Sequence, residues 1–156
     1  MRIQIIAVGS RMPAWVQAGV QEYQRRLTGG LRLEIREIAA ARAALRADPE
    51  RVRADEAKRL LAAIPERARV VALDERGVAW STRELALQVG EWMQEAPEVA
   101  WLVGGAEGLA PECLARADAC WSLSRLTLPH ALVRVVLAEQ VYRVQTLLSG
   151  HPYHRA

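Results

Sequence analysis

Three stretches in the last third of the chain carry most of the information about its fold: VGGAEG at Val103–Gly108, WSLSRLTLPHALVRVVLAEQVYR at Trp121–Arg143, and HPYHRA at His151–Ala156. In the first, a glycine turn follows an apolar segment. In the second, a loop rich in Ser, Thr and Leu runs into a helix that begins beside a proline. The third is rich in side chains that hydrogen-bond or titrate, whereas chain termini usually fray. We therefore expect a tail that closes over a site built by the glycine turn and the loop.

Short apolar runs alternate with amphipathic stretches along the whole chain, which is typical of an α/β protein. The predicted strands are Met1–Val8, Leu31–Ile38, Arg69–Leu73 and Val99–Val103. The predicted helices are Pro13–Leu27, Asp48–Ile64, Ser81–Glu95, Pro111–Ala119 and Ala131–Leu148. A turn is expected at Asp74–Gly77, and Ala39–Ala47 is expected to be a loop or the lead-in to a helix. The pattern predicts one domain, residues 1–156, with a mostly parallel sheet covered by helices on both faces.

The last predicted helix carries two apolar arcs rather than one. At about 100° per residue, one arc holds Val133, Leu137, Val141, Val144 and Leu148, and the other holds Ala131, Val135, Ala138 and Tyr142. A surface helix needs only one apolar face, so the second arc indicates that something besides the sheet covers this helix. A second copy of the chain would supply that cover in a twofold homodimer. A helix buried entirely in its own core would show the same two arcs.

Length and composition are those of an ordinary globular protein, with 156 residues of which 51% are hydrophobic and 25% charged. The net charge of +3 is concentrated in residues 1–48, which hold eight arginines against four acidic residues. Such cations contact phosphates, although a solvated arginine-rich face gives the same count. No stretch predicts a signal peptide or a membrane span. Cys113 and Cys120 are expected to be reduced thiols in a cytoplasmic protein, and no metal site is predicted.

Ligands bind α/β sheets outside the carboxyl ends of the strands, and three segments meet that description. They are Leu73 with Asp74, Gly104–Gly108, and Ser122–Pro129. Glycines there would let a ligand approach the backbone, although Gly-Gly-x-x-Gly is more often only a tight turn. The polar groups of Ser122–Pro129 would either bond one another or bind a flat heterocycle such as adenine. His130 follows at the predicted helix start, in either a functional or a purely structural role.

Taken together, these motifs resemble one family. GGAEG, the run LSRLTLPHALVRVVLAEQVYR, the terminal HPYHR and the opening IAVGSRMPAWVQAGVQEYQRRL are similar to the SPOUT-class ribosomal RNA large subunit methyltransferase H family, from one end of the chain to the other. The sequence departs from the family pattern at the Ala-dominated Ala39–Ala47 and at Ala106, where proline is common. The resemblance implies S-adenosylmethionine-dependent N3-methylation of a pseudouridine in 23S rRNA, on the assembled ribosome.

The resemblance also implies a SPOUT fold, in which the segment from about Arg69 onward ties a C-terminal trefoil knot and the last helix docks on the partner in a homodimer. The positions that match the family's cofactor site are Leu73, Gly105, Ser124, Arg125, Leu126, Thr127, Leu128 and Pro129. The N3–H of a pseudouridine is a weak acid, so a general base is expected. The candidate catalytic residues are Tyr153, His154, Arg155 and His130, with Arg155 holding a phosphate or the anionic base.

Two other functions fit the sequence less well. A ribosome-binding module that had lost catalysis would bind RNA without regard to S-adenosylmethionine, and the intact Tyr153-His154-Arg155 tail argues against it. A Rossmann-type nucleotide enzyme would need a G-x-G-x-x-G turn with an acidic residue about 20 positions beyond it, and that turn is missing.

Overall fold

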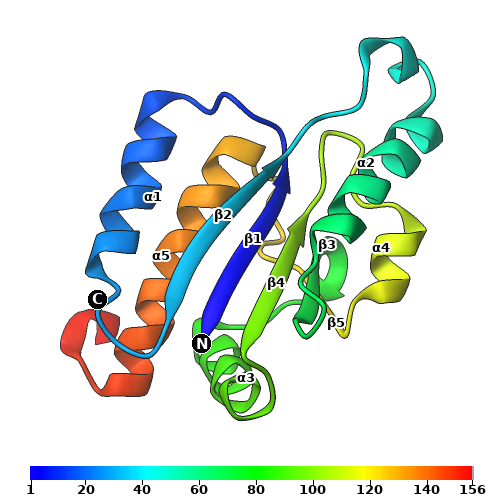
Figure 1. Ribbon diagram of the computed structural model, residues 1–156. Coiled ribbons are helices and arrows are strands. Elements are labelled where there is room, and N and C mark those ends of the chain that lie inside the picture. The colour runs from blue at the N-terminus through cyan, green and yellow to red at the C-terminus, as the bar shows by residue number, and fades with distance from the viewer. Residues whose placement is uncertain (156) are drawn as a thin grey trace.

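A computed structural model describes residues 1–155, apart from the side chain of His154. The chain forms a five-stranded sheet in the order β2-β1-β4-β3-β5, and each pairing between these strands is parallel (Figure 1). In chain order the elements are β1 (Arg2–Val8), α1 (Ala14–Arg26), β2 (Arg32–Ile38), α2 (Pro49–Ala63), β3 (Arg69–Val78), α3 (Thr82–Glu95), β4 (Glu98–Val103), α4 (Pro111–Arg116), β5 (Ala119–Trp121) and α5 (His130–Ser149). Short 3₁₀ helices lie at Ala43–Leu45 and Pro152–Arg155.

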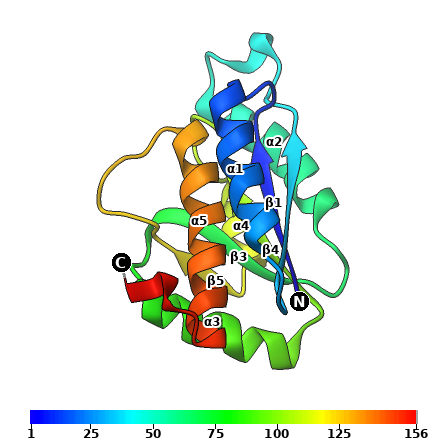
Figure 2. The ribbon, with the colours of Figure 1, turned by 90° about the vertical axis from the view of Figure 1, so that its left-hand side faces the viewer.

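Helices cover both faces of the sheet. α1, α3 and α5 lie on one face (Figure 2), where their apolar side chains pack around Ile5 and Trp101. α2 and α4 pack on the other face, around Ile6 and Leu102. Because the inner strands are buried on both sides, their sequences are nearly continuous apolar runs rather than alternating ones. The predicted α/β class, with a parallel sheet covered on both faces, is confirmed.

Side-chain caps or a left-handed glycine mark three of the helix ends. The Asp48 side chain accepts hydrogen bonds from backbone N–H groups in the first turn of α2. Ser81 and Glu84 form a reciprocal capping box at the start of α3. α5 ends at Gly150, whose φ of 72° is the left-handed conformation that glycine adopts readily. The four predicted strands and five predicted helices are all present, with shifts at some of their ends.

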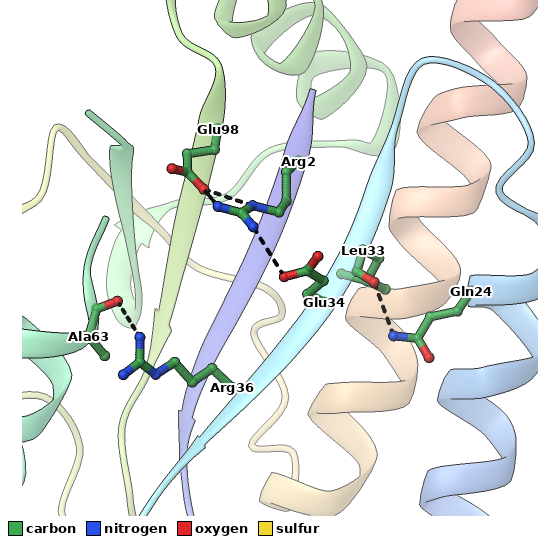
Figure 3. Close-up of polar contacts among 7 residues, drawn as sticks. All are labelled: Arg2, Gln24, Leu33, Glu34, Arg36, Ala63 and Glu98. Atoms are coloured by element: carbon green, nitrogen blue, oxygen red, sulfur yellow. Dashed lines mark hydrogen bonds and ion pairs between the residues drawn. The ribbon is translucent and has the colours of Figure 1, made fainter. Parts of the chain in front are cut away.

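Polar contacts align the edge strand β2 with its neighbours (Figure 3). Arg2 of β1 pairs with Glu98 of β4 at 2.5 Å and with Glu34 of β2 at 3.6 Å. Arg36 of β2 donates to the backbone oxygen of Ala63 in α2 at 3.2 Å. Solvent screens the exposed ion pairs, so they fix the alignment of the strands more than they stabilise the fold.

The second apolar arc of α5 packs on α1 of the same chain. Val135 lies against Gly19, where an added Cβ would come within 3.2 Å of the Val135 Cγ1 atom. The rings of Tyr142 and Tyr23 lie beside each other, with centroids 6.2 Å apart. α1 therefore supplies part of the cover that we expected from a second copy of the chain. The two arcs alone do not require a homodimer, which stays a prediction.

The region after Leu73 differs from the prediction in two ways. The expected turn at Asp74–Gly77 is instead part of β3, which runs on to Val78 with a shift in register, so that both Leu73 and Val78 pair with Trp121. The helix expected to reach Ala119 ends at Arg116, and a short strand, β5, begins at Ala119. β5 was missed because three residues are too few to show a period in the sequence.

Gly77 allows β3 and β5 to come together. A Cβ at this position would lie 2.6 Å from the Trp121 backbone nitrogen and 2.7 Å from the Cys120 carbonyl carbon. No side chain fits there without separating the two strands. Since β5 leads directly into Ser122–Pro129, this contact sets where that loop begins.

We expect Gly77→Ala to destabilise the protein, because the added methyl group would press on backbone atoms of β5 rather than on a movable side chain. The free energy of unfolding should fall by about 1–3 kcal/mol, as in overpacked cores. Urea denaturation followed by circular dichroism measures this change.

Gly90→Ala is the matched control. Gly90 lies inside α3, and its added methyl group would approach only the Leu148 Cδ2 atom, at 3.6 Å. Alanine is favoured over glycine inside a helix by about 1 kcal/mol, so this variant should be at least as stable as the wild type. Equal stability of the two variants would contradict the role assigned to Gly77.

Candidate functional site

The carboxyl ends of β1 and β4 lie side by side at one edge of the sheet (Figure 1). The chain leaves β1 toward β2 on one side, and it leaves β4 toward β5 on the other. Such a divergence is the topological switch point at which α/β sheets bind ligands. Fold topology alone therefore places a candidate site beyond Val8 and Val103.

Strand register brings the three predicted cofactor segments to this edge. Ala72 of β3 pairs with Leu102 of β4, and Leu73 pairs with Trp121 of β5. Leu73 therefore lies between the strand ends from which the glycine turn and the Ser122–Pro129 loop depart. Residues far apart in the chain meet here because their strands are neighbours in the sheet.

The glycine turn is tightly packed against its own chain. Gly108 donates its N–H to the Gly105 oxygen at 3.0 Å and has a φ of 79°. A Cβ at Gly104 would lie 2.6 Å from the Gly108 carbonyl carbon, and one at Gly105 would lie 2.8 Å from Glu56 Oε2. Protein atoms, not a ligand, therefore account for glycine at these two positions. Beside Gly108 the space is open, since a Cβ there would meet no heavy atom within 4 Å.

Two side chains of α2, Glu56 and Arg53, contact the Gly104–Gly108 turn. The sequence analysis did not select either of them. Glu56 is buried, with 4% of its surface exposed; its Oε1 accepts the backbone N–H of Ala41 at 3.0 Å, and its Oε2 is buried without a hydrogen-bond partner. Arg53 donates to the Glu107 backbone oxygen at 3.3 Å. Glu56 lies three residues after Arg53 on an amphipathic helix. Nothing in the local sequence therefore indicates that its side chain faces the protein interior.

The Ser122–Pro129 loop satisfies part of its own hydrogen bonding. Ser122 is buried, and its hydroxyl donates to the Ser124 backbone oxygen at 3.3 Å. The Ser124 hydroxyl oxygen in turn accepts the Leu126 N–H at 2.9 Å. Leu126 is 75% exposed, an unusual place for a large apolar side chain. The other loop positions singled out in the sequence are half-buried at Leu128 and exposed at Arg125, Thr127 and Pro129.

Asp74 follows Leu73 at this edge and carries a perturbed carboxylate. The Arg76 guanidinium hydrogen-bonds to it at 2.9 Å, and this contact lowers the pKa of Asp74. On the neighbouring strand, burial raises the pKa of the Cys120 thiol, and the Asp74 charge adds to the effect. The edge therefore combines a fixed negative charge with an uncharged thiol at neutral pH.

Arg134 joins α5 to the ends of β1 and β2. Its buried guanidinium donates to Glu37 Oε2 at 3.0 Å and to the Gly9 backbone oxygen at 2.8 Å. His130, the first residue of α5, lies one turn earlier and is half-buried. Sequence reasoning did not select Arg134, although an arginine between Val133 and Val135 is unusual on a helix with two apolar arcs.

A groove of about 280 Å³ lies between α1 and β2, lined in part by Gln17, Gln21, Glu37 and Arg134. Gln24 also lines it and donates to the Leu33 backbone oxygen at 3.1 Å (Figure 3). The groove shares no lining residue with the predicted cofactor positions, so it is a separate feature of the surface.

The C-terminal tail lies against α5. The Tyr153 hydroxyl donates to Glu139 Oε1 at 3.3 Å, its ring lies 4.6 Å from that of Tyr142, and the Arg143 guanidinium lies 4.9 Å from its centroid. Burial, followed by a hydrogen bond with Tyr23, raises the pKa of Tyr153 to about 12.

The tail is therefore not brought together with the other candidate residues. Figures 1 and 2 both show it at the end of α5 remote from the ends of β1 and β4. Among the described residues, its hydrogen bonds and ring contacts reach neither the glycine turn nor the Ser122–Pro129 loop. Arg155 is exposed, and the side chain of His154 lies outside the described residues. The expected closure of the tail over the site is not the arrangement seen in the single chain.

Cys113 and Cys120 are free thiols, and burial raises the pKa of Cys113 to about 11. Among the described side chains of residues 1–155, which exclude that of His154, no group of three or more His, Cys, Asp or Glu is arranged to hold a metal ion. No helix in the described part of the chain is long and apolar enough to cross a membrane.

The comparisons with known proteins agree on one family. The family model described as "Predicted SPOUT methyltransferase" matches residues 1–154. A protein of Nitrosococcus oceani named "Ribosomal RNA large subunit methyltransferase H" is 53% identical over 156 residues, which cover 100% of this chain and 99% of the relative. A protein of the same name from Thioalkalivibrio sulfidiphilus is 54% identical over 155 residues, 99% of each chain.

One solved structure shows the same fold. A methylase-family protein from Neisseria gonorrhoeae superposes with a TM-score of 0.54 over 96% of this chain and 93% of that one, at 12% identity. The resemblance found in the sequence is thus confirmed over the whole length of the chain. The chain belongs to the SPOUT methyltransferase family.

Proposed function

We propose that this protein is an S-adenosylmethionine-dependent methyltransferase that methylates N3 of a pseudouridine in large-subunit 23S rRNA, on the assembled ribosome. The end-to-end identity of 53% with relatives named ribosomal RNA large subunit methyltransferase H carries the proposal. A protein that acts on ribosomes would work in the cytoplasm.

The edge of the sheet fits the proposed cofactor. Leu73, the open space beside Gly108 and the exposed Leu126 belong to the three segments that follow neighbouring strands, and the two leucines offer apolar contact. S-adenosylmethionine would be held there by Leu73, Gly105 and Ser124–Pro129, and when bound it supplies a methyl group activated on a sulfonium. The protein's part is to align the attacking nitrogen with that methyl group and to exclude water.

The proton on N3 must leave as the nitrogen attacks, so a base is needed at the site. With a pKa of about 12, Tyr153 remains a phenol at neutral pH and can donate a hydrogen bond but cannot take the proton. His154 and His130 remain the candidate bases, and Arg155 is proposed to hold a phosphate or the anionic base. Tyr153 is better suited to place the tail than to accept a proton.

A homodimer is part of the proposal. In a single chain the tail contacts α5, on the far side from the glycine turn. A second copy could bring its own tail and its arginine-rich residues 1–48 to the cofactor edge. The two subunits together would form the surface that binds RNA.

The trefoil knot also belongs to the proposal. After β5, the chain leaves the edge of the sheet next to β3 and returns through Ser122–Pro129 to α5 beside α1. α4, just before β5, packs on the opposite face. This crossing from one face of the sheet to the other is compatible with a C-terminal knot and supports that part of the proposal.

The first prediction concerns the reaction itself. Ribosomes that lack their own modification should take up labelled methyl groups from S-adenosylmethionine, and nucleoside analysis should find the label in N3-methylpseudouridine. Deproteinised rRNA should take up little, because a small basic surface cannot select one nucleotide in free RNA. Cofactor binding without label in any ribosomal particle would contradict the proposed substrate, and no cofactor binding would favour a non-catalytic ribosome-binding module.

A second prediction concerns the tail. Deleting Tyr153–Ala156 should lower kcat by about 10²–10⁴-fold, the usual contribution of a positioned base, with less than threefold change in affinity for the cofactor. Single-turnover rates and calorimetry measure the two quantities. Equal losses of both, or of neither, would contradict a role for the tail in chemistry.

Tyr153→Phe separates the phenol from the rest of the tail. Its raised pKa leaves Tyr153 protonated throughout pH 6–9, so the variant should keep the pH profile of the wild type even if its rate is lower. Loss of the acidic limb of the profile in Tyr153→Phe would identify Tyr153 as the base after all.

A third prediction concerns RNA contact by Ala39–Ala47. Arg42 and Arg46 are exposed in this segment, so changing both to alanine should weaken ribosome binding and reduce its dependence on salt. Arg67→Ala is the control, because Arg67 is exposed in the turn before β3, at the opposite edge of the sheet. If the control weakens binding as much as the double variant, the contact is not specific to this segment.

A further inference from the structure

Glu56 stands out because it is a buried carboxylate to which the proposed reaction gives no role. It lies in α2 with 4% of its surface exposed. Its Oε1 has one hydrogen-bond partner, the N–H of Ala41, and its Oε2 has none. A buried carboxylate with an unsatisfied oxygen costs free energy, and an apolar side chain of similar volume would pack there at lower cost. We therefore expect the Glu56 carboxylate to do more than pack in the interior.

The two oxygens of Glu56 face the two loops of the candidate site. Oε1 holds Ala41, in the Ala39–Ala47 segment proposed to contact RNA. Oε2 lies against Gly105 so closely that a Cβ on that residue would be 2.8 Å away. One side chain thus touches a segment on the RNA side and the turn on the cofactor side.

Neighbouring arginines of α2 repeat this arrangement. Arg59 donates to the Ala39 backbone oxygen at 3.1 Å, in the same segment as Ala41. Arg53 donates to the Glu107 backbone oxygen at 3.3 Å, in the same turn as Gly105. α2 therefore contacts both loops at several points, and Glu56 is the buried contact among them.

We propose that Glu56 is a positioning residue that holds the Ala39–Ala47 segment against α2, beside the Gly104–Gly108 turn, so that RNA binding by the enzyme depends on it. Glu56 does not touch the reacting atoms. It acts by keeping the segment folded back over the helix. The structural part of this proposal stands alone, and its effect on substrates rests on the proposed function.

Glu56→Leu is the decisive variant, because leucine fills a similar volume without an acceptor and its replacement of a buried charge is not expected to reduce stability. Ala41 then loses its partner. In the ligand-free protein, trypsin should cut after Arg42 and Arg46 about tenfold faster than in the wild type, as expected when one hydrogen bond to a charged group is lost from the closed form. Mass spectrometry of the fragments measures each rate.

Two further variants isolate the cause. Glu56→Gln keeps an oxygen that can accept the Ala41 N–H, so it should restore most of the protection. Lys58→Ala removes an exposed side chain from the same helix, and trypsin should cut this variant after Arg42 and Arg46 at the wild-type rate. The proposal would be overturned if trypsin cut Glu56→Leu no faster than Lys58→Ala. It would also be overturned if trypsin cut Glu56→Gln as fast as Glu56→Leu.

Steady-state kinetics test whether Glu56 affects the binding of the substrates. KM for ribosomes should rise about tenfold in Glu56→Leu, whereas KM for S-adenosylmethionine and kcat should each change less than about threefold, because leucine keeps the packing against Gly105. Calorimetry with S-adenosylhomocysteine should show an affinity close to that of the wild type. A residue needed only for stability would lower kcat through the amount of folded enzyme and leave KM for ribosomes unchanged, and that result would overturn the positioning role.

Failure of the proposed function would look different. A wild-type protein that neither binds S-adenosylhomocysteine nor methylates ribosomes would refute that function, whereas the trypsin measurements would still decide whether Glu56 holds the segment.

Discussion

Parallel pairing of β1 with both β2 and β4 is the constraint on which the rest of this structure depends. Parallel neighbours cannot be joined by a tight turn, so each connection must cross a face of the sheet, and helices cover both sides. All strands then end at the same edge. The connections leaving β1 and β4 diverge to opposite sides, and this divergence places the candidate site at that edge.

The loop that completes this edge depends on a strand of only three residues. β5 is kept in place by its packing and not by its length: Trp121 lies 5.2 Å edge-on to Trp101 and 5.8 Å from Trp80, measured between ring centroids. Gly77 lets β3 approach the same strand closely. Aromatic pairs of this kind contribute about 0.5–1.5 kcal/mol beyond the area they bury. The start of Ser122–Pro129 is therefore set by the core.

One part of the candidate site is held in place within the single chain, and the other part is not assembled there. Leu73, the glycine turn and the loop are held by neighbouring strands and by α2, which suits the binding of a cofactor in one orientation. Tyr153, by contrast, packs on Tyr142 and Glu139 of α5. Tyr153 thus lies away from the edge that fits the cofactor, whereas His130 directly follows the loop. This separation is the reason why the proposed function includes a second subunit.

Local sequence was sufficient for most of the fold. The alternating segments, the caps at Asp48 and Ser81 and the buried runs depend on residues a few positions apart, so their periods and signals can be read directly. The motifs that resemble the SPOUT family were also sufficient to predict the family, because they extend from the first strand to the tail.

Only the tertiary structure revealed β5, the buried faces of Glu56 and Arg134, and the docking of Tyr153. Arg134 and Glu37 are 97 positions apart, and Glu56 meets Gly105 only because α2 packs beneath the end of β4. No local period marks such a residue, since its neighbours in space come from other elements. A buried charge is recognised by what surrounds it, and the surroundings exist only once the chain has folded.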